Sequence, residues 1–218
     1  MNYTDLVKAV KGYLENDFPT TTAASLTSAE QINIFIRQAE QRIYNEVHIL
    51  ELRKNATTSV SIDNQYLTAP SDWLATYSLA VKDATGAYHP VINKDVNFIR
   101  EAYPQPTDTG LPKYYALFDS DSMILGPTPD ASYAIELHYF YYPQSIVDGA
   151  TSWLGDNFDS ALLYGTLLEA ATFQQSDPDV MENYYGRYGE AMGLLEQLAE
   201  GKNRRDTYRT EQKRIPDS

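Results

Sequence analysis

The spacing of apolar residues changes twice along the chain, and this change constrains the fold most. Over residues 32–50 apolar residues recur every three or four positions, as on one face of a helix. Between about 55 and 145, short alternating runs such as "TTSVSI" (57–62) are separated by turn residues, a pattern typical of antiparallel strands. Helical spacing then returns and continues to about residue 200. A sheet-forming segment is therefore inserted between helical segments.

Helix boundary signals support this division. Ser28 and Gln31 have the spacing of a capping box and predict the start of the long N-terminal helix. Asp177 followed by Pro178 predicts the start of the last helix, and Gly201 predicts its end.

The fold class predicted from these patterns is α+β. We expect an antiparallel helical bundle from residues 1–52 and 150–200, with a small antiparallel β domain over residues 53–149 inserted into it. A segment that begins near Asp156 or Asp159 and runs to Phe173 is apolar on nearly all sides, which predicts a central, buried helix. Residues 201–218 have few large apolar side chains, so we expect an extended, flexible C-terminal arm.

An aromatic run, "GPTPDASYAIELHYFYYP", lies at residues 126–143. Counting by two puts one apolar and aromatic set on a single face, which predicts the core of the sheet: Tyr133, Ile135, Leu137, Tyr139 and Tyr141. Phe140 and Tyr142 lie on the opposite, mixed face. They could cover the bundle, contact a neighbouring subunit or stack on a ligand, and the first two alternatives are favoured over the third.

Charge is unevenly distributed along the chain. The net charge is −13, but residues 201–218 contain six basic and three acidic residues and so carry +3. The remaining 200 residues carry −16, and an acidic body repels phosphate groups. We therefore expect no broad nucleic-acid binding by the body of the protein.

No motif for catalysis or for a metal is evident. The chain has no cysteine, and His48, His89 and His138 are too far apart for a local metal motif. Asp119 and Asp121 fit a hairpin turn better than a calcium loop. A distant carboxylate pair for glycoside hydrolysis stays open, because such residues can lie far apart in a chain. We predict a protein that is not an enzyme, with no catalytic residue, cofactor or metal.

Targeting signals are also missing from the pattern. The start of the chain does not resemble a signal peptide, and no run approaches the roughly 20 apolar residues of a membrane helix. We expect a soluble protein without a membrane partner, and the absence of cysteine fits synthesis in a reducing cytoplasm.

The order of several short stretches resembles the head-to-tail adaptor (connector) proteins of tailed bacteriophages, over roughly residues 3–200. The stretches are "IRQAEQRIYNEV", "APSDWL", "DVNFIREAYP", "GLPKYYALFDSDSMILGPTPDASYAIELHYFYYP" and "LLYGTLLEAATF". The resemblance implies a structural virion protein at the portal–tail junction, made in the host bacterial cytoplasm. It implies a ring of copies, most often twelve, that joins the portal protein to a tail or nozzle protein and lets DNA pass without sequence-specific binding.

The resemblance also implies roles for particular residues. The C-terminal arm would bind the portal, and its contact candidates are Lys202, Arg204, Arg205, Tyr208, Arg209, Lys213, Arg214 and Ile215. A heterologous subunit interface is a further expectation for a closed ring. Its candidates are Phe140, Tyr142, Tyr184, Tyr185 and Tyr188.

A carbohydrate-binding tail or accessory module is the alternative function. Trp73 and Trp153 would be its stacking residues, although both lie beside predicted element boundaries and suit packing anchors better.

Overall fold

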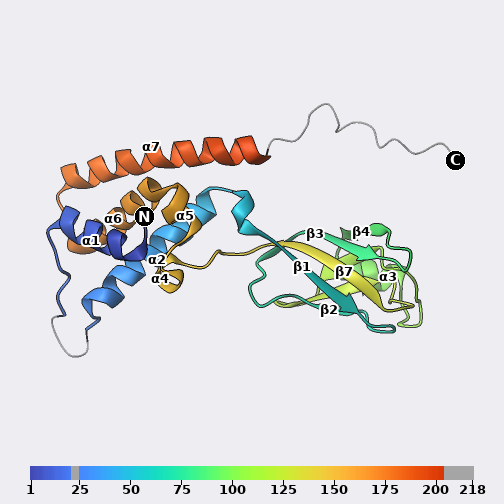
Figure 1. Cartoon of the computed structure of the whole chain (residues 1–218). Coiled ribbons are helices and arrows are strands. Elements are labelled where there is room, and N and C mark those ends of the chain that lie inside the picture. Colours follow the sequence, from blue (N-terminus) through green and yellow to red (C-terminus); the bar gives the residue numbers. More distant parts are fainter. Residues whose placement is uncertain (21–24, 204–218) are drawn as a thin grey trace. The chain divides into compact units, whose positions relative to one another are not determined.

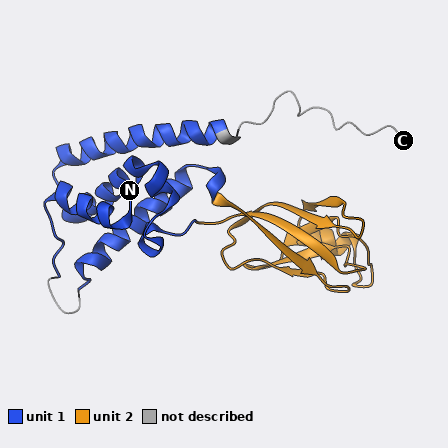
Figure 2. Cartoon of the chain, in the orientation of Figure 1, with its two compact units in different colours: residues 1–51, 143–218 blue, residues 52–142 orange. Residues whose placement is uncertain are grey.

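The computed structural model of the chain describes the backbone of residues 1–20 and 25–203 and the side chains of residues 1–20 and 25–201. The predicted C-terminal arm falls almost wholly outside these limits. The portal-contact candidates that lie outside the described side chains are Lys202, Arg204, Arg205, Tyr208, Arg209, Lys213, Arg214 and Ile215. The chain divides into two compact units, Met1–Glu51 with Pro143–Ser218 and Leu52–Tyr142 (Figure 2). We call them the helical unit and the β unit.

The helical unit is organised around helix α6 (Asp159–Gln174), against which α1, α2, α5 and α7 pack (Figure 1). The bounds of the other helices are α1 (Tyr3–Leu14), α2 (Ser28–Glu46), α4 (Ile146–Gly149), α5 (Trp153–Asn157) and α7 (Pro178–Asn203). Buried residues lie on nearly every side of α6, from Ala161 and Leu162 to Ala171. The prediction of a central, buried helix is confirmed.

The helix ends differ slightly from those predicted. Thr27, one residue earlier than Ser28, caps α2, and Glu30 completes the capping box by accepting a hydrogen bond from the Thr27 N–H (2.8 Å). Helix α7 begins at Pro178, as predicted. It continues past Gly201 to Asn203, so Gly201 is a residue of the helix and not its end.

The β unit is built on one seven-stranded sheet with strand order β1-β7-β3-β4-β5-β6-β2. The strands are β1 (Arg53–Val60), β2 (Tyr66–Thr68), β3 (Ala75–Lys82), β4 (Tyr88–Asn93), β5 (Tyr114–Leu117), β6 (Ser122–Gly126) and β7 (Tyr133–Phe140). A 3-10 turn (Leu50–Leu52) precedes β1, and helix α3 (Val96–Ala102) follows β4. The sheet curls into a nearly closed, barrel-like form (Figure 1).

The predicted architecture is wrong. The chain is α+β, but it has this seven-strand, barrel-like sheet and seven helices in its described part, in place of a helical bundle with a small antiparallel β insertion. Strands β4 and β5 are parallel, with Ile92 opposite Tyr114. The physical reason is α3: it forms the crossover that a parallel pair requires, whereas a hairpin would have made the pair antiparallel.

The core of the β unit confirms the prediction for the aromatic strand. Ile135, Leu137 and Tyr139 of β7 are buried, and Tyr133 and Tyr141 pack against the same cluster. Strand β7 lies between β1 and β3, so both of its edges are paired within the sheet. Most rings of this strand therefore fill the core.

Candidate functional site

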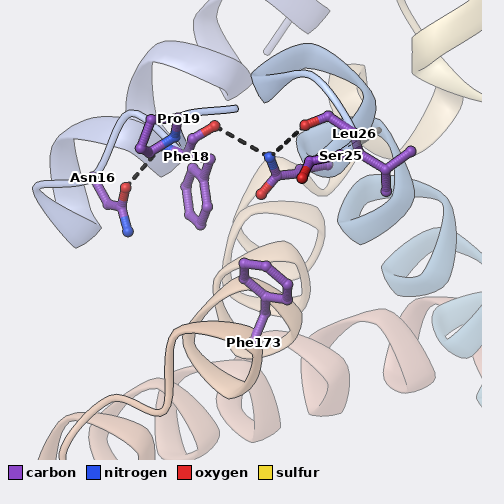
Figure 3. Close-up of a pocket in the computed structure, with 7 residues that line it drawn as sticks. Asn16, Phe18, Pro19, Ser25, Leu26 and Phe173 are labelled. Carbon is purple, nitrogen blue, oxygen red and sulfur yellow. Dashed lines mark hydrogen bonds between the residues drawn. The ribbon is translucent and has the colours of Figure 1, made fainter. Parts of the chain in front are cut away.

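The helical unit contains an apolar recess at the connection between α1 and α2, near the end of α6 (Figure 3). We call it the phenylalanine recess. Its volume is about 380 Å³, and its lining residues are Asn16, Phe18, Pro19, Ser25, Leu26, Gln31 and Phe173. The recess thus joins residues from two segments that are about 150 positions apart in the chain.

Two phenylalanines of the lining, Phe18 and Phe173, form an aromatic cluster with Phe35. The centre of the Phe35 ring lies 5.5 Å from that of Phe18 and 5.3 Å from that of Phe173, within the range of favourable aromatic contacts. Phe18 is only 2% exposed, whereas Phe173 is 60% exposed. One ring of the cluster therefore remains open to solvent.

Side-chain amides fix the backbone at the edge of the recess. The buried Gln31 amide donates to the Phe18 carbonyl (3.2 Å) and to the Leu26 carbonyl (2.9 Å), as the dashed lines in Figure 3 show. Asn16 Oδ1 accepts from the Phe18 N–H (2.7 Å). These bonds hold Phe18 at a left-handed φ of 51°, an unfavourable conformation for a residue with a Cβ.

The lining chemistry suits binding. None of the seven lining residues has a side chain that ionises near neutral pH. The recess offers rings, two amides and one hydroxyl, so it can receive an apolar side chain and hydrogen-bond its surroundings. It does not offer the acid or base that proton transfer would require.

The residues predicted for a subunit interface lie in both units. Phe140 of β7 is half-buried and packs edge-to-face on Tyr77, with ring centres 5.8 Å apart, and Tyr142 is 41% exposed. Tyr184 and Tyr185 lie on α7, and Tyr185 is 69% exposed. The structure does not bring the five candidates together into one cluster within either unit.

Tyr188 is placed differently from the others. It is buried between α7 and α2, and its hydroxyl donates to Glu46 Oε2 (2.8 Å). Burial, together with this bond to a carboxylate, raises the pKa of Tyr188 well above its usual range. This ring fastens α7 to α2 within one copy of the chain.

Comparison with known proteins gives the family. The family model described as SU10 adaptor protein matches residues 1–214 of the chain. The chain belongs to the SU10 adaptor protein family. It is thus a phage adaptor and a component of the virion. A search of the curated proteins found no match.

The two tryptophans of the adaptor serve packing. Trp73 packs against the core of the β unit and donates from Nε1 to Thr76 Oγ1 (3.2 Å). Trp153 of α5 stacks on Phe158, with ring centres 5.6 Å apart. Both are half-buried, which leaves little of either ring for a sugar.

Histidines and carboxylates of the adaptor pair locally. His89 lies 2.8 Å from Asp83 and His138 lies 2.9 Å from Glu136, both at the surface of the β unit. Among the described residues no group of three or more histidine, cysteine or acidic side chains could hold a metal ion. The Asp119–Asp121 segment forms the β5–β6 hairpin turn, as predicted, with Phe118 N–H bonded to the Ser122 carbonyl (2.9 Å).

Sequence reasoning missed the phenylalanine recess. The Phe18-Pro19 pair lies between the first two helical segments, and the sequence analysis predicted no site there. A large apolar residue before a proline in such a connection is a signal of packing, but the sequence does not say that its partner is Phe173.

No helix in the described ranges is long and apolar enough to cross a membrane.

Proposed function

We propose that this adaptor joins the portal ring of a phage capsid to the tail, as a homo-oligomeric ring through which DNA passes. The observation that carries the proposal is the family match over residues 1–214, which covers both compact units. The protein would be made in the host cytoplasm and would act at the portal–tail junction of the virion.

Portal binding is assigned to the C-terminal residues 201–218. Their six basic residues would pair with acidic groups of the portal. The body would then hold the tail or nozzle protein, and no catalytic step is required.

An acidic channel would help DNA to pass without adhering. Residues 1–51 and 143–201 contain 17 acidic and five basic side chains, so the helical unit repels phosphates. Exchanging the acids that face the channel for amides is expected to slow ejection of the genome. Unchanged ejection kinetics would count against this role.

The first experiment is to measure the mass of the purified protein, alone and mixed with the portal of the same genome. We expect a chain of 24.6 kDa that joins the portal as a large ring. Absence of binding at low salt, with the full chain, would overturn the head-to-tail role and bring a carbohydrate-binding module forward.

A truncation after Gly201 tests the arm separately. It removes residues 202–218, and the shortened protein is expected to fold normally but to lose portal binding. A truncated chain that binds the portal as tightly as the full chain would refute the role of the arm.

A further inference from the structure

Cations of the β unit are held over aromatic rings. The distances from cation to ring centre are 4.1 Å (Arg53 over Tyr77), 5.2 Å (Lys54 over Tyr141), 5.3 Å (Lys82 over Tyr88), 5.2 Å (Lys94 over Phe98) and 5.8 Å (Arg100 over Phe118). Lys54 also pairs with Asp72 (2.7 Å). Lys82, Lys94 and Arg100 form no ion pair with an acid in the described part of the chain.

Both units are net acidic, and the helical unit has the larger surplus: residues 1–51 and 143–201 contain 17 acidic and five basic side chains, whereas the β unit contains ten and six. In the helical unit Arg37 forms an ion pair with Asp148 (2.7 Å), and Arg42 pairs with Glu169. After these pairs a large surplus of acidic side chains remains on this unit. Local complementarity is therefore limited to single side chains: among the described residues Lys82, Lys94 and Arg100 of the β unit lack an acidic partner, and the helical unit has acids in excess of its bases.

A second recess lies in the β unit, beside α3. We call it the α3 recess; its volume is about 250 Å³, and its lining residues are Gln65, Tyr66, Ile99, Arg100, Tyr103, Pro104, Pro106 and Ile124. Arg100 is the one charged residue in this lining. Phe118, whose ring centre lies 5.2 Å from that of Tyr66, holds the guanidinium in place. Rings, prolines and a positioned guanidinium suit an apolar side chain that arrives with a carboxylate.

Helix α7 presents such a combination. Leu194 is 63% exposed, one of the most exposed large apolar side chains described. Glu190 lies one turn before it, on the same side of the helix, and its side chain is 75% exposed. Glu190 has a loose contact with Arg187 at 3.6 Å, so its carboxylate can take a better partner.

We propose that the α3 recess of one copy receives Leu194 of α7 from a second copy, with Glu190 of that helix bound to Arg100. The contact joins two different surfaces, so repeating it adds further copies instead of stopping at a dimer, and the copies form a ring when the rotation between neighbours closes. It rests on the ring of the proposed function and names the surfaces that would build it.

Disulfide trapping tests the contact directly, since the chain has no cysteine of its own. Two full-length proteins are mixed, one with Leu194→Cys and the other with Pro106→Cys and a small size tag, with and without the portal. A mild oxidant should link them into a heterodimer of distinct mass. The matched control pairs Leu194→Cys with Ala84→Cys, an exposed hairpin residue outside the α3 recess, and should give little product.

Charge reversal tests whether formation of the disulfide depends on the pairing of Arg100 with Glu190. Arg100→Glu in the Pro106→Cys protein should lower the yield at least about fivefold, because like charges would then face each other. Glu190→Arg in the Leu194→Cys protein should restore it. Far-UV circular dichroism and the melting temperature of each variant confirm folding.

Two results overturn the proposal: a yield no higher than that of the Ala84→Cys control with and without portal, or a yield that Arg100→Glu leaves unchanged. The test distinguishes failure of this interface from failure of the proposed function. If the protein binds the portal but gives no specific disulfide-linked heterodimer, only this interface is refuted. If it gives the heterodimer but does not bind the portal, only the portal role is refuted.

Discussion

At the scale of single residues, Glu40 shows how one buried carboxylate anchors the start of α4 to α2. Glu40 of α2 is 3% exposed, and its Oε1 accepts from the backbone N–H of Ile146 (2.9 Å). Ile146 begins α4, directly after the chain has returned from the β unit at Pro143. Burial raises the pKa of Glu40 above its ordinary 4.5, although Ile146, Ser145 and Arg37 favour the charged form.

The raised pKa of Glu40 predicts a pH-dependent effect of Glu40→Gln. The folded state binds the proton at a higher pH than the unfolded chain, so the contribution of Glu40 to unfolding free energy rises as pH falls toward 4.5. The amide keeps an acceptor for the Ile146 N–H without burying a charge. Glu40→Gln is therefore expected to be more stable than the parent at pH 7, and this advantage should shrink toward pH 4.

Urea unfolding at several pH values measures this advantage. The same exchange at the exposed Glu182 of α7 is the control and should show no such trend. An advantage of Glu40→Gln that stays constant from pH 7 to pH 4 would contradict the argument.

Gln31 supports a second prediction at this scale. Gln31→Leu removes the donor of both the Phe18 and the Leu26 carbonyl at the edge of the phenylalanine recess. The unfolding free energy should fall by about 1–3 kcal/mol. Gln38→Leu, the same change at an exposed position of α2, should cost far less. Equal losses from chemical denaturation of the two variants would show that the amide bonds contribute little.

At the scale of elements, the sequence predicted the helices and strands whose apolar pattern or boundary residues lie within the element itself. The apolar stripe of α2, the Asp-Pro start of α7 and the alternation of β7 each reflect a period that the sequence itself carries. Strands β2 and β4 carry no such signal: the first has three residues, and the second contains Pro90 and exposes most of its side chains. Such strands exist because neighbours pair with them, and single-sequence patterns do not report neighbours.

The contact between α3 and β6 depends on one glycine and gives a third prediction. A Cβ at Gly126 would lie 2.8 Å from Ile99 Cγ2 and 3.1 Å from Tyr103 Cδ2, both in the segment of α3. Gly126→Ala should therefore push α3 from the sheet and destabilise the protein by about 1–3 kcal/mol. Gly189→Ala on α7 meets nothing within 4 Å, and its better helix propensity should stabilise by about 1 kcal/mol. Thermal unfolding of the two variants should give shifts of opposite sign, and a loss from both would reject this account.

At the scale of the whole molecule, the change from helical spacing of apolar residues to strand spacing and back predicts that a β segment is inserted between helices. It does not predict the architecture of that segment. The site shows the same limit. Phe18 and Phe173 meet in one recess, and Arg100 stacks on Phe118, only because distant segments fold together. The sequence shows which aromatic and basic residues are present, but long-range packing determines which of them are in contact.

The insertion itself leads to the last prediction, that residues 52–142 fold without the helical unit. The two ends of this segment are already joined: Tyr141 N–H bonds to the Leu52 carbonyl (2.9 Å), and Arg53 lies opposite Phe140 in the β1–β7 pair. Its core consists of its own residues, among them Leu79, Leu137 and Tyr139, so excision exposes none of that cluster to a missing partner. The excised segment should give a dispersed amide NMR spectrum and one cooperative thermal transition. Gly126→Ala should lower that transition by about 4–8 °C for each kcal/mol lost. A collapsed spectrum, or a transition that Gly126→Ala does not move, would mean that the helical unit is needed to form the sheet.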